Sequence, residues 1–321
     1  MRDITALGEI LIDFTPLGKS TQGNDTFEAN PGGAPCNVLA MMRTLGNETA
    51  FIGKLGTDPF GQKIRKTLDN LSIDTSGLIM TDEYMTTMAF VSLSESGDRT
   101  FNFARKQSAD IMLEKDEVHL NLIKDSRIFH CGSLSLTSDP ARSATIYALE
   151  YAKANKICIS VDPNLRELLW NDLDYARESI NLLLSYADII KISDYELDFL
   201  YESGDFQEKV EKLYKKFIPK ILFITCGKNG SYVKFRDKAQ WHKCYMNVKT
   251  IDTTGAGDAF LGACLHKLLE FNLNFESLTD QSCMDIIHFA SAAAALFTTK
   301  KGALKSMPSL AEINDLLNRT V

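Results

Sequence analysis

The sequence alternates short apolar runs with longer helical patterns, and this alternation constrains the fold more than any other feature. Strand-like runs lie at Ile4–Leu7, Ala50–Ile52, Ile128–Cys131, Ile157–Val161, Ile189–Ile192 and Ile221–Thr225. Helical patterns separate or follow them, at 37–45, 60–71, 141–154, 175–186, 206–217, 258–270, 280–299 and 309–318. Strand–helix–strand order predicts an α/β fold with a mainly parallel central sheet and helices on both faces.

Two stretches, residues 11–30 and 86–104, break this order because apolar and polar residues alternate along them. Alternation with a period of two is typical of a sheet with one wet face. These strands either form a small β-lid over the main sheet or extend its edge, and the pattern alone favours neither. No internal repeat or linker is visible, so we expect a single domain over residues 1–321 with an inserted lid.

Charge and cysteine usage limit the partners and the compartment. The formal net charge is −7, with 35 basic and 42 acidic residues, which argues against a nucleic-acid or anionic-membrane partner. The first residues do not resemble a signal peptide, and no apolar run reaches the roughly 18–20 residues of a membrane helix. Seven cysteines without CxxC spacing indicate reduced thiols, so we expect a cytoplasmic protein.

A Gly-rich turn, Asp252-Thr-Thr-Gly-Ala-Gly-Asp258-Ala-Phe260, leads directly into an apolar helical run. Such a turn points backbone N–H groups at one place, where the helix dipole favours anions. A carboxylate there is no anion ligand, so we interpret Asp258 as a base beside a bound phosphate. Taken alone, the turn fits a tight loop feeding a buried helix equally well, and Asp258 fits an ordinary residue of a helix N-terminus.

Other phosphate-binding motifs are absent from the sequence. Gly18-Lys19-Ser20 has the end of a Walker A loop, but Asp13 stands where the first glycine is required. The order Gly255-x-Gly257-x-x-Phe260 lacks the third glycine of a dinucleotide fingerprint. The protein-kinase signatures are missing too. A phosphate site therefore has to be built from the turn at 252–260 together with other segments.

A second Gly-rich helix start lies at Asn30-Pro-Gly-Gly-Ala-Pro-Cys-Asn37. Adjacent glycines let a small ligand approach the backbone closely, and Asn37 either caps the helix or offers a donor and an acceptor to hydroxyl groups. Asp13 is expected at the end of the first strand, where α/β proteins place ligand-binding residues. Arg166 follows another predicted strand, and its guanidinium either pairs with phosphate oxygens or is solvated.

Together these motifs resemble the ribokinase-like, or PfkB-type, carbohydrate kinases, in the family's order along nearly the whole chain. Gly8–Asp13 resembles the family's opening segment, Gly32–Asn37 its N-terminal signature and Asp252–Phe260 its C-terminal signature. Thr225–Gly230 is similar to its nucleotide-side turn. Ser193–Glu196 resembles its N-x-x-E segment, with Ser in place of the usual Asn. The resemblance implies a ribokinase-like fold with a β-lid over a sugar.

The resemblance also implies ATP-dependent phosphorylation of a sugar hydroxyl. Asp258 corresponds to the base that accepts the hydroxyl proton, and the amides of Gly255, Ala256 and Gly257 to the hole that stabilises the transferring phosphoryl group. The implied sugar contacts come from Asp13, Gly32, Gly33, Asn37, Arg105, Arg166 and Asp258. The implied nucleotide contacts come from Ser193, Glu196, Thr225, Gly227, Gly230 and Gly257.

Two cations and a mode of assembly also follow from the resemblance. Mg²⁺ is implied with ATP, because a metal neutralises the phosphates. Family members bind K⁺ through backbone carbonyls near the anion hole, and the matching positions are Asp252, Thr254, Phe297, Lys300, Gly302 and Ser306. Dimers are common in the family, and a lid edge with Phe90, Phe101 and Phe103 predicts a homodimer through the lid.

Within the family the chain most resembles fructokinases, in the segments Cys131–Leu136, Asp162–Arg166 and Thr298–Ala303. The lid segment 101–105 is similar too, although Ala104 replaces the aromatic residue that commonly precedes the Arg. The nearest alternative is 2-keto-3-deoxygluconate kinase, because Arg105 suits its carboxylate, followed by other sugar or nucleoside kinases of the family. A non-catalytic sugar-binding relative and a dinucleotide-binding oxidoreductase are the alternatives from other classes.

Overall fold

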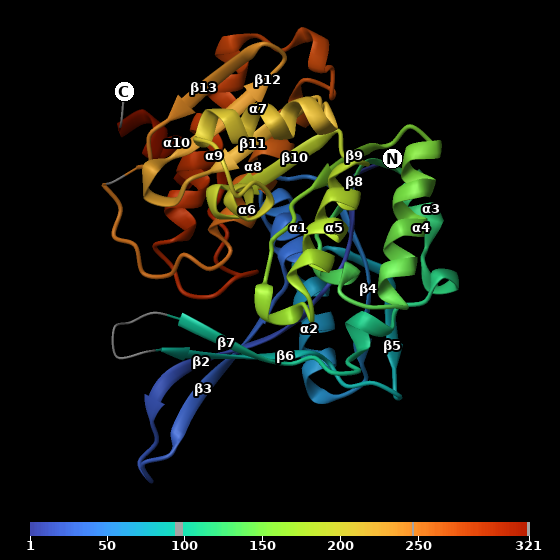
Figure 1. Cartoon of the computed structure of the whole chain (residues 1–321). Coiled ribbons are helices and arrows are strands. Elements are labelled where there is room, and N and C mark those ends of the chain that lie inside the picture. The colour runs from blue at the N-terminus through green and yellow to red at the C-terminus, as the bar shows by residue number, and fades with distance from the viewer. Residues whose placement is uncertain (94–98, 246, 320–321) are drawn as a thin grey trace.

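Two β-sheets organise the protein, which we describe from a computed structural model covering residues 1–93, 99–245 and 247–319 (Figure 1). The main sheet has nine strands in the order β13-β12-β11-β10-β9-β8-β1-β4-β5. Every ladder from β5 to β11 is parallel, and the edge strands β12 and β13 are antiparallel. The strands are β1 Arg2–Leu7, β4 Thr49–Gly56, β5 Asp74–Thr81, β8 Ser126–Cys131, β9 Cys158–Val161, β10 Ile189–Ser193, β11 Ile221–Thr225, β12 Ser231–Phe235 and β13 Lys238–His242.

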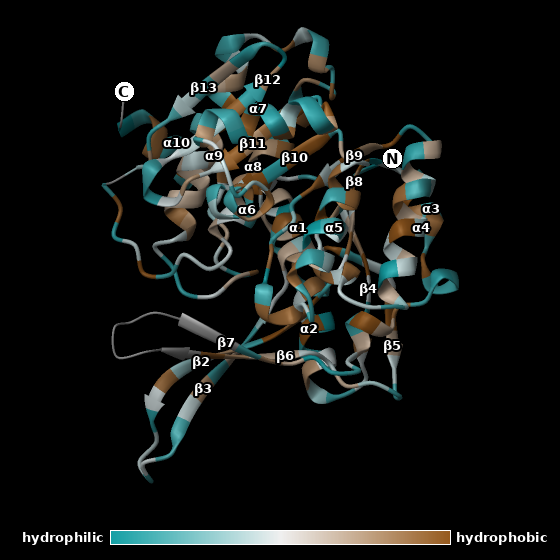
Figure 2. Ribbon diagram, in the orientation of Figure 1, coloured by the Kyte–Doolittle hydropathy of each residue, from teal (hydrophilic) through white to brown (hydrophobic). Residues whose placement is uncertain are grey.

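Helices cover both faces of the main sheet because its strands carry apolar residues on both sides. In β11, Ile221 and Phe223 belong to one buried cluster, and Leu222 and Ile224 belong to the other. The first cluster is completed by α1 Ala34–Thr44, α2 Pro59–Asn70, α8 Ala256–Glu270, α9 Asp280–Phe297 and α10 Leu310–Arg319. The second is completed by α3 Leu120–Lys124, α4 Ala141–Ala154, α5 Leu173–Leu184, α6 Asp194–Leu200 and α7 Phe206–Phe217. Figure 2 shows hydrophobic residues along the central strands and hydrophilic ones on outward-facing helix surfaces.

The second sheet is separate from the first and has four strands in the order β3-β2-β6-β7. Its strands are β2 Leu11–Lys19, β3 Asp25–Gly32, β6 Met88–Leu93 and β7 Arg99–Ala104, and Figure 1 shows them projecting from the body. The rings of Phe14 and Phe90 stack with centroids 4.9 Å apart on this sheet. The predicted segments 11–30 and 86–104 therefore form a lid and do not extend the main sheet. Residues 94–98 and the side chain of Phe101 lie outside the described part of the chain.

The predicted α/β fold is confirmed, with two differences in detail. Strands β5, β12 and β13 were not among the predicted strands, because they lie near or at the sheet edges and mix polar residues with apolar ones, as in Lys-Ala-Gln-Trp-His of β13. The prediction that Asp13 ends the first strand is wrong. Strand β1 ends at Leu7, and Asp13 lies within lid strand β2, paired in register with Asn30 of β3.

Candidate active site

The N-terminus of α8 opens onto a cavity of about 680 Å³ at the carboxyl ends of β10 and β11. Gly255 caps the helix with φ +88°, a left-handed conformation that favours glycine. The N–H of Ala256 donates to Thr253 O at 3.1 Å, so this amide of the predicted hole is already engaged. Among the described residues no acceptor is found for the N–H groups of Gly255, Gly257 and Asp258, which leaves these amides for an anion.

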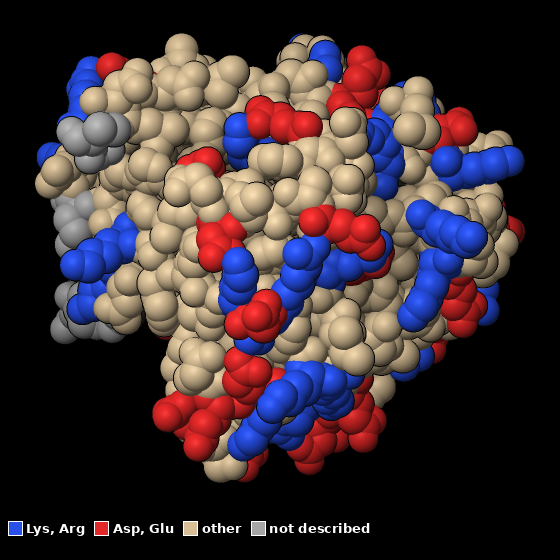
Figure 3. Space-filling view, turned by 90° about the horizontal axis from the view of Figure 1, so that it is seen from above, with Lys and Arg blue, Asp and Glu red and all other residues tan. Residues whose placement is uncertain are grey.

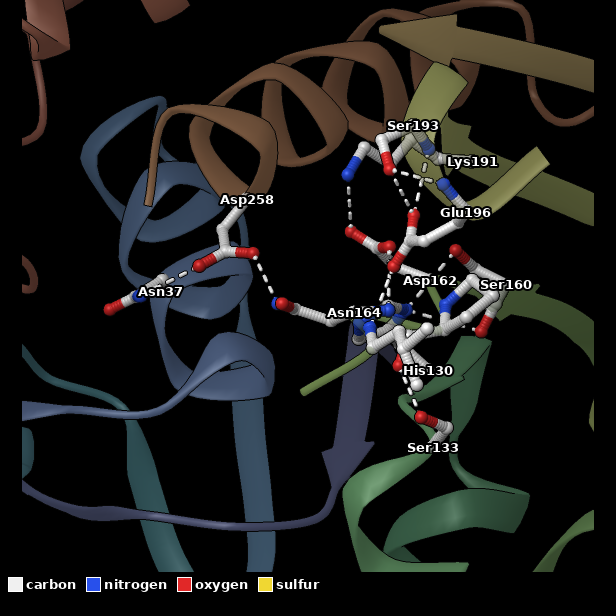
Figure 4. Close-up of polar contacts among 12 residues, drawn as sticks. Asn37, His130, Ser133, Ser160, Asp162, Asn164, Lys191, Ser193, Glu196 and Asp258 are labelled. Atoms are coloured by element: carbon white, nitrogen blue, oxygen red, sulfur yellow. Dashed lines mark hydrogen bonds and ion pairs between the residues drawn. The ribbon is translucent and has the colours of Figure 1, made fainter. Parts of the chain in front are cut away.

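Two asparagines hold the carboxylate of Asp258, a buried residue that is only 5% exposed. Asn37 Nδ2 donates to Oδ2 at 2.7 Å and Asn164 Nδ2 donates to Oδ1 at 3.1 Å, from opposite sides of the carboxylate (Figure 4). Burial raises the pKa of Asp258 to about 7, helped by the charge of Asp162 and opposed by the Asn37 hydrogen bond and by Lys191. A carboxylate with a pKa near 7 is suited to accept a proton at neutral pH.

The residues predicted to contact the nucleotide line this same cavity. Ser193, Glu196, Thr225, Gly227 and Gly230 share its wall with the α8 turn. A Cβ added at Gly227 would meet no atom within 4 Å, so the backbone there is open to a ligand. A Cβ at Gly230 would lie 2.1 Å from the carbonyl oxygen of His242, so the turn into β12 requires glycine.

Glu196 connects the nucleotide side of the cavity to the segment that carries Asn164. Its Oε2 accepts hydrogen bonds from the N–H and the hydroxyl of Ser193, at 2.8 and 2.7 Å, in a capping box at the start of α6. Its Oε1 accepts from the N–H of Leu165 at 2.7 Å. Both oxygens are thus used within the protein, and the predicted contact of Glu196 with the nucleotide stays a prediction.

Asp13, Gly32 and Gly33 lie together where the lid joins the body. A Cβ at Gly32 would lie 2.6 Å from Asp13 Oδ2, and a Cβ at Gly33 would lie 2.5 Å from the carbonyl oxygen of Glu9. No hydrogen-bond donor to the Asp13 carboxylate is found in the described part of the chain. Burial raises the pKa of Asp13 to about 6, opposed by Arg166 and reinforced by Asp252. The lid therefore presents an available acceptor beside the glycines.

The two predicted arginines have different surroundings. Arg105 is 7% exposed, and its guanidinium donates to Asp110 Oδ2 at 2.8 Å, Leu134 O at 2.9 Å and Thr137 Oγ1 at 3.0 Å. It is therefore held in a network that fixes the chain after β7, and its contact with a substrate stays a prediction. Arg166 lines the cavity together with Asp258, and its guanidinium donates to the adjacent Leu165 O at 3.0 Å.

Comparison with known proteins matches residues 1–310 to the pfkB family carbohydrate kinase model. Among curated proteins, Fructokinase-1 of Zea mays is 39% identical over 321 residues, covering 98% of each chain, and Fructokinase-1 of Oryza sativa subsp. japonica is 39% identical over 317 residues, covering 98% of this chain and 97% of that protein. The chain belongs to the PfkB family of carbohydrate kinases. It is accordingly an ATP-dependent phosphotransferase, and the predicted family is confirmed.

Solved structures of fructokinases are similar to this chain over nearly its whole length. Fructokinase with bound ATP from Xylella fastidiosa superposes with a TM-score of 0.91 at 28% identity, covering 100% of this chain and 99% of that one. A double mutant of the Vibrio cholerae O395 fructokinase, in a form bound to fructose, ADP and potassium ion, gives a TM-score of 0.87 at 30% identity, covering 99% and 98%. The ribokinase-like fold with its lid is therefore shown for this chain.

Three residues near the turn at 252–260, Asp162, Asn164 and Lys191, were not among the predicted site residues. Asn164 adopts φ +47° and reaches Asp258, while its own N–H donates to Asp162 Oδ1 at 3.2 Å. The other oxygen of Asp162 lies 2.9 Å from Lys191 Nζ (Figure 4). Two weak features of the sequence could have indicated them, although neither is a motif. Asp162 and Asn164 directly follow an apolar run, and Lys191 is a charged residue inside another.

The segments predicted to bind K⁺ lie next to the turn at 252–260. Thr298 O accepts the N–H groups of Ile251 and Asp252 at 2.7 and 3.0 Å, so the chain before the turn is tied to the end of α9. The ammonium of Lys300 donates a hydrogen bond to Glu312 Oε1 at 2.8 Å. In the described residues no cluster of three or more His, Cys, Asp or Glu side chains could hold a metal. A cation here would depend on carbonyl oxygens, and the site stays a prediction.

The rest of the described surface differs in character from the cavity at α8. An open hollow of about 900 Å³ lies at the opposite end of the strands, where Arg2 pairs with Asp74 at 2.5 Å. On the face seen in Figure 3, basic and acidic side chains are intermixed and form no broad basic field. None of the helices in the described part of the chain is long and apolar enough to cross a membrane.

Proposed function

We propose that this carbohydrate kinase transfers the γ-phosphoryl group of ATP to a hydroxyl of fructose. The observation that carries the proposal is the buried Asp258 carboxylate, held between Asn37 and Asn164 at the amide-lined start of α8. Full-length similarity to plant fructokinases at 39% identity supports fructose as the acceptor. The fructose-bound form of the Vibrio cholerae relative supports the same choice.

We assign a role to each group at the proposed site. Asp258 accepts the proton of the attacking hydroxyl, and its pKa near 7 keeps a large fraction of it ionised at neutral pH. The open amides of Gly255, Gly257 and Asp258 stabilise charge on the transferring group. The carboxylate of Asp13 accepts hydrogen bonds from sugar hydroxyls and so orients the acceptor.

The nucleotide is assigned to the cavity wall formed by Thr225, Gly227, Gly230 and Ser193. A volume of about 680 Å³ and the open backbone at Gly227 are compatible with a nucleoside triphosphate. Bound with ATP, Mg²⁺ neutralises phosphate charge. We also propose that K⁺ binds the carbonyls of the segments at 252–254 and 297–306, which match the cation-binding positions of the family and lie beside the α8 turn.

The alternative acceptor, 2-keto-3-deoxygluconate, receives no support from Arg105, because that guanidinium is engaged by Asp110, Thr137 and Leu134 O. Arg166 still offers a cation in the cavity, so the acidic sugar belongs in any substrate test. Dimerisation through the lid also stays a prediction. Leu17, Phe27 and Phe90 are exposed on that sheet, and size-exclusion chromatography with light scattering would test the assembly.

The test is a coupled ADP-release assay over fructose, tagatose, ribose, 2-keto-3-deoxygluconate and nucleosides, with K⁺ or Na⁺ as the monovalent salt. We expect the highest kcat/KM with fructose and a rise in kcat when K⁺ replaces Na⁺. A higher kcat/KM with 2-keto-3-deoxygluconate would reject fructose while keeping the kinase. Equal rates in K⁺ and Na⁺ would reject a K⁺ requirement.

A further inference from the structure

Lys191 is a buried lysine whose ammonium lies against the first turn of α8. The residue belongs to β10, is 5% exposed and lines the cavity together with Gly257 and Asp258. A Cβ added at Gly257 would lie 2.7 Å from Lys191 Nζ. The ammonium therefore sits directly beside the amides that face the cavity.

The charge of Lys191 is held in place by one carboxylate and is otherwise unused. Its Nζ lies 2.9 Å from Asp162 Oδ2, and no second acceptor is found among the residues that the structure describes. An ammonium has three N–H donors, so two remain for a ligand. Burial by itself would lower the pKa of Lys191. The charges of Asp162, Glu196 and Asp258 outweigh that effect, so the net shift of the pKa is upward. The group is therefore a fixed cation at neutral pH.

Neutralisation of the Asp162 charge does not by itself explain why Lys191 faces the cavity. Lys234 on β12 shows what a buried structural pair looks like here, since it is equally buried at 5% exposure and lies 2.6 Å from Glu211 Oε1. Lys234 is absent from the cavity wall, whereas Lys191 faces the amides. A cation beside the path of a phosphoryl group stabilises the negative charge of the transition state, and the effect is large because the site is shielded from water.

We propose that Lys191 is a further phosphate-binding residue of the transfer site, anchored by Asp162 and donating to the phosphoryl group as it moves. During transfer the sugar oxygen bonds to the γ-phosphorus while the bond from that phosphorus to the β,γ-bridging oxygen breaks. The bridging oxygen leaves with the electron pair on ADP, and the sugar proton passes to Asp258. Lys191 keeps its proton throughout. The proposal rests on the proposed transfer at Asp258 and holds for any sugar acceptor.

The kinetic test compares Lys191→Met with the matched variant Lys234→Met. Loss of one charge-stabilising donor costs about 10²–10³-fold in kcat, so Lys191→Met should fall by that factor with the KM for sugar little changed. Lys234→Met should keep wild-type kcat and lose only stability. Wild-type kcat in Lys191→Met would overturn the proposal.

A double variant, Lys191→Met with Asp162→Asn, separates binding of phosphate from simple neutralisation of Asp162. It removes both members of the Lys191–Asp162 ion pair together and keeps an acceptor for the Asn164 N–H, so it should fold even where the single variant does not. We expect its kcat to remain about 10²–10³-fold low. Recovery of wild-type kcat would show that Lys191 only neutralises Asp162. If the wild-type protein itself turned over none of the sugars, the proposed function would be refuted instead.

A binding measurement provides a readout that is independent of turnover. Calorimetry would compare the affinity for Mg·ADP with and without aluminium fluoride, which mimics the moving phosphoryl group, in the presence of fructose. The wild type should bind more tightly with the fluoride, since a site complementary to the transition state prefers its mimic. The double variant should lose most of this gain while its affinity for Mg·ADP alone changes less than about threefold. A full gain in the double variant would overturn the proposal.

Discussion

Asn37 and Asp258 lie 221 positions apart in the sequence and share a buried hydrogen bond of 2.7 Å. The contact joins the starts of α1 and α8, which pack against each other along their length. Gly262 of α8 makes this packing close, because a Cβ there would lie 2.7 Å from Met41 Cβ and 2.9 Å from Val38 O. The helix packing thus sets the position of the proposed base relative to the sugar loop.

Replacing Asp258 by Asn should remove proton acceptance while preserving the size of the side chain. Loss of a general base costs about 10²–10⁴-fold, so we expect kcat to fall by that factor with fructose. Thermal unfolding and fructose binding by calorimetry would show that the variant is folded and still binds sugar. Turnover near the wild-type rate would exclude Asp258 as the base.

The pH dependence of kcat should have an acid limb near pH 7. Below that value Asp258, with its pKa of about 7, becomes protonated and can no longer accept the hydroxyl proton. We expect kcat to fall about tenfold per pH unit well below the limb. The measurement is a pH–rate profile at saturating fructose and ATP. A flat profile between pH 5 and 8 would contradict the assignment.

The same pKa predicts how Asp258 affects stability. Its folded-state pKa is raised above the unfolded value, so its contribution to folding is full below about pH 4 and is lost as pH rises through about 7. The neutral Asp258→Asn side chain should therefore be more stable than wild type at pH 8, by at most about 4 kcal/mol, with a smaller difference at pH 5. Urea unfolding at both pH values would measure this. Equal stabilities at pH 8 would show that the carboxylate is not destabilised by burial.

Asn164→Gly should slow the reaction without destabilising the protein. Glycine accepts the φ of +47° at this position but removes the 3.1 Å hydrogen bond that orients Asp258. We expect a fall of about tenfold in kcat, the equivalent of about 1.4 kcal/mol. Asn272→Gly is the matched control, since Asn272 has φ +54° and lies at the end of α8 far from the cavity wall. Equal kcat values in the two variants would remove Asn164 from the site.

Gly257→Ala should abolish most activity, because its Cβ would meet Lys191 Nζ at 2.7 Å and displace the ammonium or the turn. Gly262→Ala places a Cβ in an equally tight spot of the same helix, against Met41 and Val38 in the core. This second variant should lose stability by about 1–3 kcal/mol, with a smaller effect on kcat. Thermal unfolding and steady-state kinetics of both would separate the cavity from the core. Full activity in Gly257→Ala would refute the close approach of phosphate at this turn.

Much of the site could be predicted from local sequence. The turn at 252–260 needed only its glycines and its carboxylate to indicate an anion site beside a base, and the positive φ of Gly255 agrees with that prediction. The pair Gly32 and Gly33 likewise indicated a close backbone approach, and an added Cβ at either position would clash. These features depend on the conformation of a few consecutive residues, which composition and spacing largely specify.

Other features depended on segments that meet only in the folded chain. Asp13 was expected on the main sheet but lies in the lid, because strand direction changes between Leu7 and Leu11, where no turn signal was recognised. Asn164, Asp162 and Lys191 form a linked group around Asp258 that no local motif announced. The predicted substrate contact of Arg105 stays a prediction, and only the fold shows that its guanidinium is held by Asp110.

The sequence by itself determined the α/β architecture, the family and the identity of the proposed base, because periodicity and a short turn motif encode them locally. Tertiary structure decided the state of that base. Burial raises the pKa of Asp258 to about 7, and residues from three distant segments, Asn37, Asn164 and Lys191, set its orientation and its charge environment. Electrostatic energies in a buried site depend on distances across the fold, and sequence spacing does not contain those distances.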